Sequence, residues 1–144
     1  MLSTSTKTAM PSIYIFDYDA DINYILCNWF QSHGYDVQGF STHEQLLNQL
    51  STSHPDCIIL DSMYGRLSST LNICHAIHYI FQYAGKIILT SATNLATRDI
   101  ELCNASHFIA KPFDLSEVVM EVIRLVINSR NKNNIEESVY RNVH

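Results

Sequence analysis

The stretch HPDCIILDSMYG, residues 54–65, contains four apolar residues in a row, Cys57 to Leu60, directly followed by Asp61. A short apolar run bounded by turn-forming residues is typical of a strand that is buried on both faces, as in a parallel sheet. A carboxylate at the end of such a strand is costly to bury unless it has a partner or a chemical task. Because open α/β sheets bind ligands at the carboxyl ends of their strands, the sequence predicts that Asp61 lies at a binding site.

Similar apolar runs occur along the whole chain, and segments with helical periodicity separate them. The predicted strands are residues 13–16, 35–40, 57–60, 86–90 and 107–110. The predicted helices have their apolar residues within 22–30, 46–50, 71–81, about 96–103 and 118–127. Five strands that alternate with five helices indicate parallel βαβ units, and hence a flavodoxin-like three-layer α/β sandwich with strand order 2-1-3-4-5.

Capping residues predict where these helices begin and end. The expected N-terminal signals are Asp19 or Asp21, a Ser41-Thr42-His43-Glu44 capping box, Ser68 or Ser69, and Asp114 or Ser116. The expected C-terminal signals are His33-Gly34 for the first helix and Gly85 for the third.

Composition favours one globular domain without nucleic-acid or membrane binding. The chain has 144 residues, of which 47% are hydrophobic and 16% charged, and its net charge is −5. This acidic balance, without a Lys/Arg cluster, argues against a nucleic-acid binder, and no apolar run is long enough to span a membrane. The N-terminus lacks a signal peptide, so we expect a cytoplasmic protein. We expect a disordered segment at 1–11, the domain at 12–128 and a polar tail at 129–144.

The predicted strand order brings four polar side chains to one edge of the sheet. Asp17 and Asp61 end neighbouring strands, and Thr90 and Lys111 end the fourth and fifth. Two adjacent carboxylates repel each other unless a cation lies between them, and Mg²⁺ prefers such oxygen ligands. A carboxylate oxygen can attack a phosphoryl group whose charge a lysine and a hydroxyl neutralise. The pattern therefore favours a magnesium-assisted phosphoryl site.

Four motifs in this order resemble the receiver domain of two-component response regulators: IYIFDYDADI from 13, CIILD from 57, IILTSAT from 87 and FIAKPF from 108. The resemblance covers about residues 12–128. It implies that Asp61 is the phospho-acceptor, Thr90 the switch hydroxyl and Phe108 an aromatic residue that reorients on activation. It also implies that Lys111 binds the phosphate and precedes a cis peptide bond to Pro112.

The chain departs from the receiver pattern at three places. Tyr18 stands where receivers have the second of two acids, the one that binds Mg²⁺ directly. The remaining ligands implied by the resemblance are Asp17, Asp61 and the backbone carbonyl of Met63. The residues after Asp61 lack the usual Pro and Asp-Gly, and Asn104 replaces a customary glycine, although asparagine tolerates positive φ.

The resemblance implies a stand-alone receiver in a phosphorelay. It would take a phosphoryl group onto Asp61 from a histidine kinase or phosphotransfer protein. As a signalling domain and not an enzyme, it would have at most slow self-dephosphorylation. It would signal through a protein partner or a homodimer at the surface of the fourth helix, fifth strand and fifth helix.

Two alternative functions remain open at this point. One is a pseudo-receiver that binds partners without phosphorylation, because Tyr18 replaces the metal-binding acid. The other is a haloacid-dehalogenase-type phosphatase, since Asp17-Tyr18-Asp19 fits that family's DxD after an apolar strand and Ile87 to Thr90 fits its second motif. Against it, the longer DxDx(T/V) pattern fails at Asp21 and no late pair of acids appears.

Each site residue also has a purely structural interpretation. Asp61 and Asp17 could cap helices or form turns, Thr90 could simply end a strand, Lys111 could be a surface lysine, and Phe108 could pack in the core. The four cysteines form no CxxC pair, and His75 and His78 have no acidic or thiol partner at ligand spacing, so core or solvated roles are favoured for both kinds of residue.

Overall fold

A computed structural model describes residues 10–62 and 67–129 of the chain. The segments predicted to be disordered at the N-terminus and polar at the C-terminus lie largely outside these residues. The strands are β1 (Ser12–Phe16), β2 (Asp36–Phe40), β3 (Cys57–Asp61), β4 (Lys86–Ser91) and β5 (His107–Ala110). The helices are α1 (Ala20–Ser32), α2 (His43–Leu50), α3 (Leu67–His75), α4 (Thr97–Leu102) and α5 (Leu115–Val122). Two π-helical segments, η1 (Ala76–Ile80) and η2 (Ile123–Ile127), continue α3 and α5.

The five strands form one parallel sheet in the order β2-β1-β3-β4-β5. This confirms the predicted flavodoxin-like topology, with β1 and β3 as neighbours. The register pairs Phe16 with Leu60 and Asp61 with Thr90. The carboxyl ends of β1, β3 and β4 therefore lie at the same edge of the sheet.

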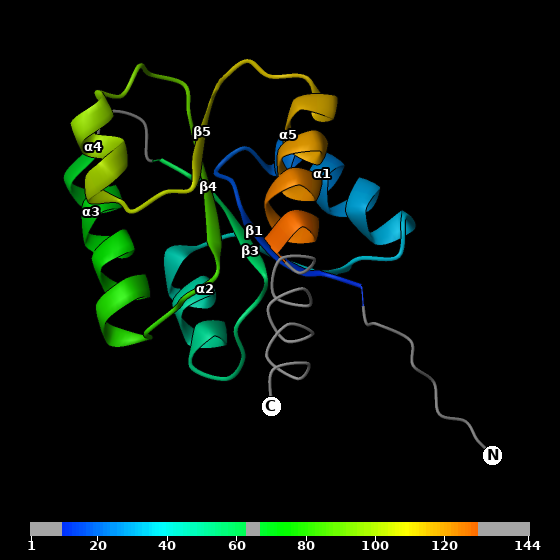
Figure 1. Ribbon diagram of the computed structural model, residues 1–144, viewed down its shortest axis with the longest axis horizontal. Coiled ribbons are helices and arrows are strands. Elements are labelled where there is room, and N and C mark those ends of the chain that lie inside the picture. The colour runs from blue at the N-terminus through cyan, green and yellow to red at the C-terminus, as the bar shows by residue number, and fades with distance from the viewer. Residues whose placement is uncertain (1–9, 63–66, 130–144) are drawn as a thin grey trace, which may run out of the picture.

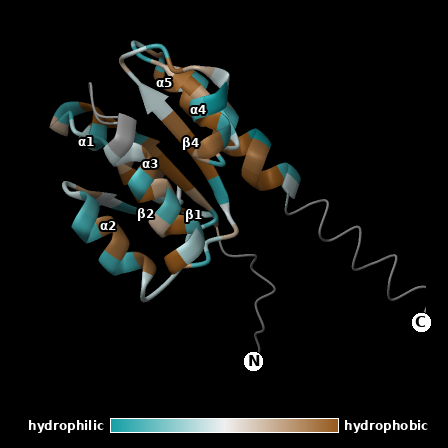
Figure 2. Cartoon of the chain, turned by 90° about the vertical axis from the view of Figure 1, so that its left-hand side faces the viewer, coloured by the Kyte–Doolittle hydropathy of each residue, from teal (hydrophilic) through white to brown (hydrophobic). Residues whose placement is uncertain are grey.

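Helices cover both faces of the sheet, and each face has its own apolar cluster. Figure 1 shows α1 and α5 on one side of the strands and α2, α3 and α4 on the other. Strand residues alternate between the faces, so that Ile58 and Leu60 join the α2/α3 cluster while Ile59 joins the α1/α5 cluster. In Figure 2 hydrophobic residues are concentrated in strands such as β4 and along α5. The central strands β1, β3 and β4 are buried from both sides, which explains their continuous apolar runs.

Two predicted helix starts are wrong by one to three residues. The capping box of α2 uses Thr42 and Gln45 in place of Ser41 and Glu44, because the Gln45 N–H donates to Thr42 Oγ1 and Gln45 Oε1 accepts from Ser41 N–H. Both pairs fit the same spacing rule, so the motif alone did not separate them. The third helix already begins at Leu67, which places the predicted cap residues Ser68 and Ser69 inside its first turn.

The predicted end of the third helix is also wrong. The helix and its π-helical continuation end at Ile80, and Gln82, with φ of 53°, takes the left-handed conformation that we expected further along at Gly85. Gly85 has a different role, because a Cβ there would lie 2.2 Å from the buried Tyr83 hydroxyl oxygen. A glycine is therefore required by the close approach of the Tyr83 ring.

The other helix-end predictions agree with the structure. Asp19 caps α1, since its Oδ1 accepts from the N–H groups of Asp21 and Ile22 at 2.9 and 3.2 Å. Asp114 precedes α5. Asn104 follows α4 with φ of 52°, the conformation that its replacement of a glycine requires.

α4 is the least buried helix of the described residues. None of its six residues is buried, and no side chain caps its N-terminus. Among the described residues all four cysteines are free thiols, three of them buried. No helix in the described part of the chain is both long and apolar enough to cross a membrane.

Candidate functional site

The carboxyl ends of β1, β3 and β5 bring together two carboxylates and an ammonium group. Lys111 Nζ lies 3.0 Å from Asp17 Oδ2 and 3.1 Å from Asp61 Oδ1. The side chains of Asp17 and Asp61 are almost completely buried, and that of Lys111 is 14% exposed. The lysine therefore bridges two buried negative charges, and the three groups together carry a formal charge of −1.

The pocket shifts the pKa of Asp61 well above its ordinary value. Burial raises it most, the neighbouring charge of Asp17 raises it further, and the Tyr18 N–H and Lys111 lower it, so that the pKa rises from 3.8 to about 6. Burial alone would lower the pKa of Lys111, but its hydrogen bonds to both carboxylates and their charges outweigh burial and raise it. Asp61 therefore has incompletely balanced negative charge in a buried pocket, which favours binding of a further cation.

Thr90 supplies a buried hydroxyl at the same edge. It is the register partner of Asp61 across β3 and β4, and its side chain is fully buried. Its Oγ1 has no hydrogen-bond partner among the described residues. A buried hydroxyl without a partner costs about 1 to 3 kcal/mol. A ligand oxygen bound beside Asp61 would offset that cost.

The β1–α1 loop contributes backbone donors to both carboxylates. The Tyr18 N–H donates to Asp61 Oδ2 at 3.1 Å, and the Asp19 N–H donates to Asp17 Oδ1 at 2.8 Å. Because the Asp19 carboxylate caps α1, it does not replace the acid missing at position 18. Asn23 Nδ2 donates to the backbone oxygen of Phe40 at 3.0 Å and to that of Asp17 at 3.4 Å, which ties this loop to the end of β2.

The side chain of Tyr18 bonds to α2 at the edge of the pocket. Its hydroxyl lies 3.1 Å from His43 Nε2, and its ring packs edge-on against Phe16 with centroids 4.6 Å apart. Burial lowers the pKa of His43, which favours the neutral imidazole. Sequence inspection missed His43, because its contact with Tyr18 spans 25 positions and no motif links the two residues.

The remaining predicted site residues have different environments. Phe108 is half-buried and packs against the α2/α3 cluster. The Lys111–Pro112 peptide bond is cis, as the resemblance implies. Met63, whose backbone carbonyl was the third expected metal ligand, lies outside the described residues.

The described residues fit a magnesium ion only through two carboxylates. No group of three histidine, cysteine or acidic residues with metal-binding geometry occurs among them. Mg²⁺ commonly keeps several water ligands and binds proteins through one or two carboxylates together with a phosphate. The residual negative charge of Asp17 and Asp61 suits such a site, but Tyr18 adds no oxygen to it because its hydroxyl bonds to His43.

Comparison with protein families gives one match that covers most of the chain. Residues 13–123 match the family model described as the response regulator receiver domain. A curated relative is a probable transcriptional regulator, ycf27, of Porphyridium aerugineum, which is 28% identical over 136 residues. The match covers 91% of this chain and 55% of the relative, so the chain spans about half the length of that relative.

Solved structures support the same fold. The receiver domain of the Francisella response regulator 1452 superimposes with a TM-score of 0.71 at 21% identity, over 83% of this chain and 98% of that one. The chemotaxis protein CheY4 of Vibrio cholerae gives a TM-score of 0.72 at 18% identity, over 81% and 99%. NtrX from Brucella abortus, solved in complex with ADP, gives 0.74 at 18% identity, over 94% of this chain and 30% of that one. At these identities the structural similarity establishes the fold.

Proposed function

Since the chain belongs to the response regulator receiver domain family, we propose that it accepts a phosphoryl group on Asp61 from a phosphohistidine of a histidine kinase or phosphotransfer protein. Receiver domains are signalling domains of two-component systems and generally not enzymes. The identity of the acceptor and the roles of its neighbours go beyond family membership. They are argued here from the geometry of the pocket.

The observation that carries the proposal is the buried Thr90 hydroxyl beside the Asp61–Lys111 pair. Asp61 provides a carboxylate oxygen, Lys111 an ammonium group 3.1 Å from it, and Thr90 a hydroxyl without a partner among the described residues. A phosphoryl group on Asp61 would bring three oxygens into reach of both donors. A merely structural role for Thr90 leaves its buried hydroxyl unexplained.

The reaction can be written with its bonds balanced. An Asp61 oxygen forms a bond to phosphorus while the bond between phosphorus and the donor imidazole nitrogen breaks. The electron pair of that bond goes to the imidazole, which takes up a proton from solvent. Lys111 and Thr90 stabilise the charge on the phosphoryl oxygens, and the raised pKa of Asp61 leaves it mostly ionised at pH 7 and above.

We further propose that Asp17 and Asp61 would hold Mg²⁺. When bound, the ion would reduce repulsion between the carboxylates and an incoming phosphoryl group. Receiver domains typically bind this metal. Tyr18 in place of an acid predicts weaker binding than three carboxylates would give.

Two surfaces suit protein partners. An apolar hollow of about 340 Å³ beside Lys111, lined by α1 and the segment before α5, could seat the phosphodonor protein. Exposed apolar residues in the two helices that flank β5, Leu102 in α4 and Met120 in α5, support the predicted output surface of α4, β5 and α5. We propose this second surface as the place where a downstream protein or a second copy of the chain binds.

A pseudo-receiver is the second candidate function, and one observation favours it. Lys111 contacts both Asp17 and Asp61 directly, so the three side chains can form a closed ionic cluster. No observation favours a phosphatase, because Asp19, the second acid of its motif, caps α1.

The first experiment is the intact mass of the protein after incubation with Mg²⁺ and acetyl phosphate. We expect a gain of one phosphoryl group in the wild type and in Asp21→Asn, which removes an exposed acid of α1. Asp61→Asn should remain unlabelled, because an amide oxygen is a poor nucleophile.

Labelling that persists in Asp61→Asn would contradict the acceptor assignment. Absence of labelling in the wild type, together with no response to Mg²⁺ or beryllofluoride, would favour the pseudo-receiver. Labelling and the response to Mg²⁺ or beryllofluoride are measured on the same samples.

A further inference from the structure

Tyr18 contacts both Asp61 at the end of β3 and His43 at the start of α2. Its backbone N–H donates to Asp61 Oδ2, and its side-chain hydroxyl lies 3.1 Å from His43 Nε2. His43 is the first residue of α2 and follows the N-cap Thr42. The start of α2 is thereby linked to the carboxylate at the end of β3.

Two neighbouring rings hold the Tyr18 side chain in position. The aromatic cluster, as we call Phe16, Tyr18 and His43, has centroid distances of 4.6 Å between Phe16 and Tyr18, 4.4 Å between Phe16 and His43, and 5.4 Å between Tyr18 and His43. Phe16 is completely buried at the end of β1, so it gives the other two rings a fixed base. Edge-on aromatic contacts of this kind contribute about 0.5 to 1.5 kcal/mol beyond area burial.

Backbone contacts anchor the β1–α1 loop, and His43 adds a side-chain contact at Tyr18 itself. The loop is anchored on either side of Tyr18, by the Asp19 N–H on Asp17 Oδ1 and by the cap of α1. Since Tyr18 is 45% exposed, burial alone leaves its side chain room to rotate. The contact with His43 restricts this rotation.

We propose that His43 is a positioning residue for the phospho-acceptor. By holding Tyr18 against Phe16, it keeps the Tyr18 N–H on Asp61 Oδ2 and couples the start of α2 to the pocket. This hydrogen bond favours the ionised carboxylate, which is the nucleophile, and it orients the other oxygen toward Lys111. The inference rests on the proposed function, since it assumes that Asp61 is the phospho-acceptor. The hydrogen bond between the Tyr18 N–H and Asp61 can nevertheless be measured without phosphorylation.

The test is amide hydrogen exchange at residue 18, followed by NMR in the full chain. In His43→Ala we expect exchange at this amide to become about tenfold faster, since about one hydrogen bond is weakened. His43→Gln retains a side-chain acceptor and should show a smaller change. The amide of Leu60 in β3 is the internal reference, because general loss of stability would accelerate both amides.

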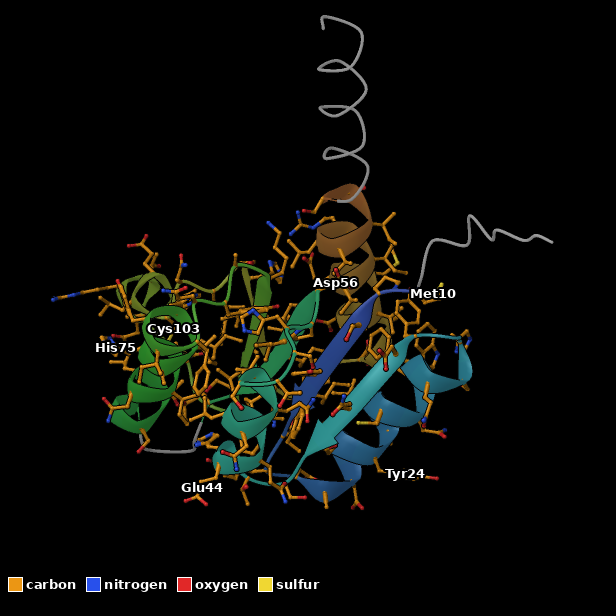
Figure 3. All side chains as sticks on the ribbon, turned by 90° about the horizontal axis from the view of Figure 1, so that it is seen from below. Met10, Tyr24, Glu44, Asp56, His75 and Cys103 are labelled. Atoms are coloured by element: carbon orange, nitrogen blue, oxygen red, sulfur yellow. The ribbon has the colours of Figure 1, made fainter. Side chains whose placement is uncertain are left out.

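Tyr18→Phe removes only the hydroxyl that contacts His43. It therefore provides the same test if His43→Ala does not fold. Its matched control is Tyr24→Phe, because Tyr24 lies on the outer side of α1 and is 70% exposed (Figure 3). Figure 3 also labels Glu44, which follows His43 at the start of α2. We expect faster exchange of the residue 18 amide in Tyr18→Phe. In the control, Tyr24→Phe, the exchange rate of this amide should be unchanged.

Unchanged exchange at residue 18 in both His43→Ala and Tyr18→Phe would overturn the inference, whether or not Asp61 is phosphorylated. Faster exchange in a protein that acetyl phosphate does not label would support the positioning role and contradict the proposed function. If the positioning role and the phosphorylation of Asp61 are both correct, the rate of labelling should fall about threefold in His43→Ala and recover partly in His43→Gln.

Discussion

The two sides of the pocket contribute different groups to it, side chains on one side and backbone N–H groups on the other. On the side of β3, β4 and β5, Asp61, Thr90 and Lys111 lie at the ends of their strands, and the Lys111 side chain contacts that of Asp61. On the side of the β1–α1 loop, the side chain of Tyr18 bonds to α2, and only its backbone reaches Asp61. The comparison teaches that the fold fixes where a residue lies, whereas the type of side chain decides whether it serves the site.

The two sides also balance charge differently. Lys111 supplies a permanent positive charge to both carboxylates. The β1–α1 loop supplies neutral N–H donors at 2.8 and 3.1 Å. Substitutions on the lysine side should therefore change stability most, and substitutions on the loop side should change metal binding.

The largest expected effect follows from removing the lysine. Lys111→Met leaves Asp17 and Asp61 buried without their cation, which should lower the free energy of unfolding by about 4 kcal/mol at pH 8. The loss should be smaller at pH 5, because Asp61 then takes up a proton. Urea denaturation at the two pH values measures both effects.

Arg98→Met is the control for this loss, since it removes an exposed charge from α4. We expect the control to change stability by less than about 0.5 kcal/mol. An equally small loss in Lys111→Met would show that the two carboxylates do not depend on the lysine.

The next effect concerns the pH dependence that Asp61 gives to stability. Its pKa of about 6 in the folded protein lies above the ordinary 3.8. The folded state therefore binds the proton more tightly, and the stability that Asp61 contributes is present below about pH 4 and lost as pH rises through 6. A shift of this size corresponds to about 3 kcal/mol.

Asp61→Asn removes this titration. We expect the free energy of unfolding of the variant, relative to wild type, to rise by about 2 to 3 kcal/mol between pH 4 and 7. Parallel pH profiles for the two proteins would contradict the raised pKa and the buried charge pair from which it arises.

The smallest expected effect concerns the loop side. Tyr18→Asp adds a carboxylate beside Asp17 and should tighten Mg²⁺ binding about tenfold, or about 1.4 kcal/mol. Tyr18→Asn provides the control, since it changes the size of the residue in the same way without adding charge. Titration calorimetry gives both affinities, and equal values would refute our explanation of the metal site.

Much of the fold could be predicted from strand patterns, because a buried parallel strand leaves a continuous apolar run and an abrupt polar end. Asp61 and Thr90 were found in this way at the ends of β3 and β4. Helix ends were less certain, since Ser41 and Thr42 both satisfy the capping rule and only the backbone geometry of the turn selects Thr42.

The contact between Tyr18 and His43 could not be predicted from sequence. Tyr18 stands where the receiver pattern has an acid, but the pattern does not say where the tyrosine side chain lies. That depends on a space between Phe16 and the start of α2, which only the packed structure defines. Likewise, sequence placed Lys111 near the acids without revealing that it bridges both.

The sheet separates the core into two apolar clusters, and this division has an evolutionary consequence. Ile58 and Ile59 are adjacent in β3, yet their side chains belong to different clusters. Free-energy changes caused by substitutions without shared neighbours add. Substitutions can therefore accumulate behind α2 and α3 without compensation behind α1 and α5, so that each helix layer can diverge at its own pace while the strands between them stay constant.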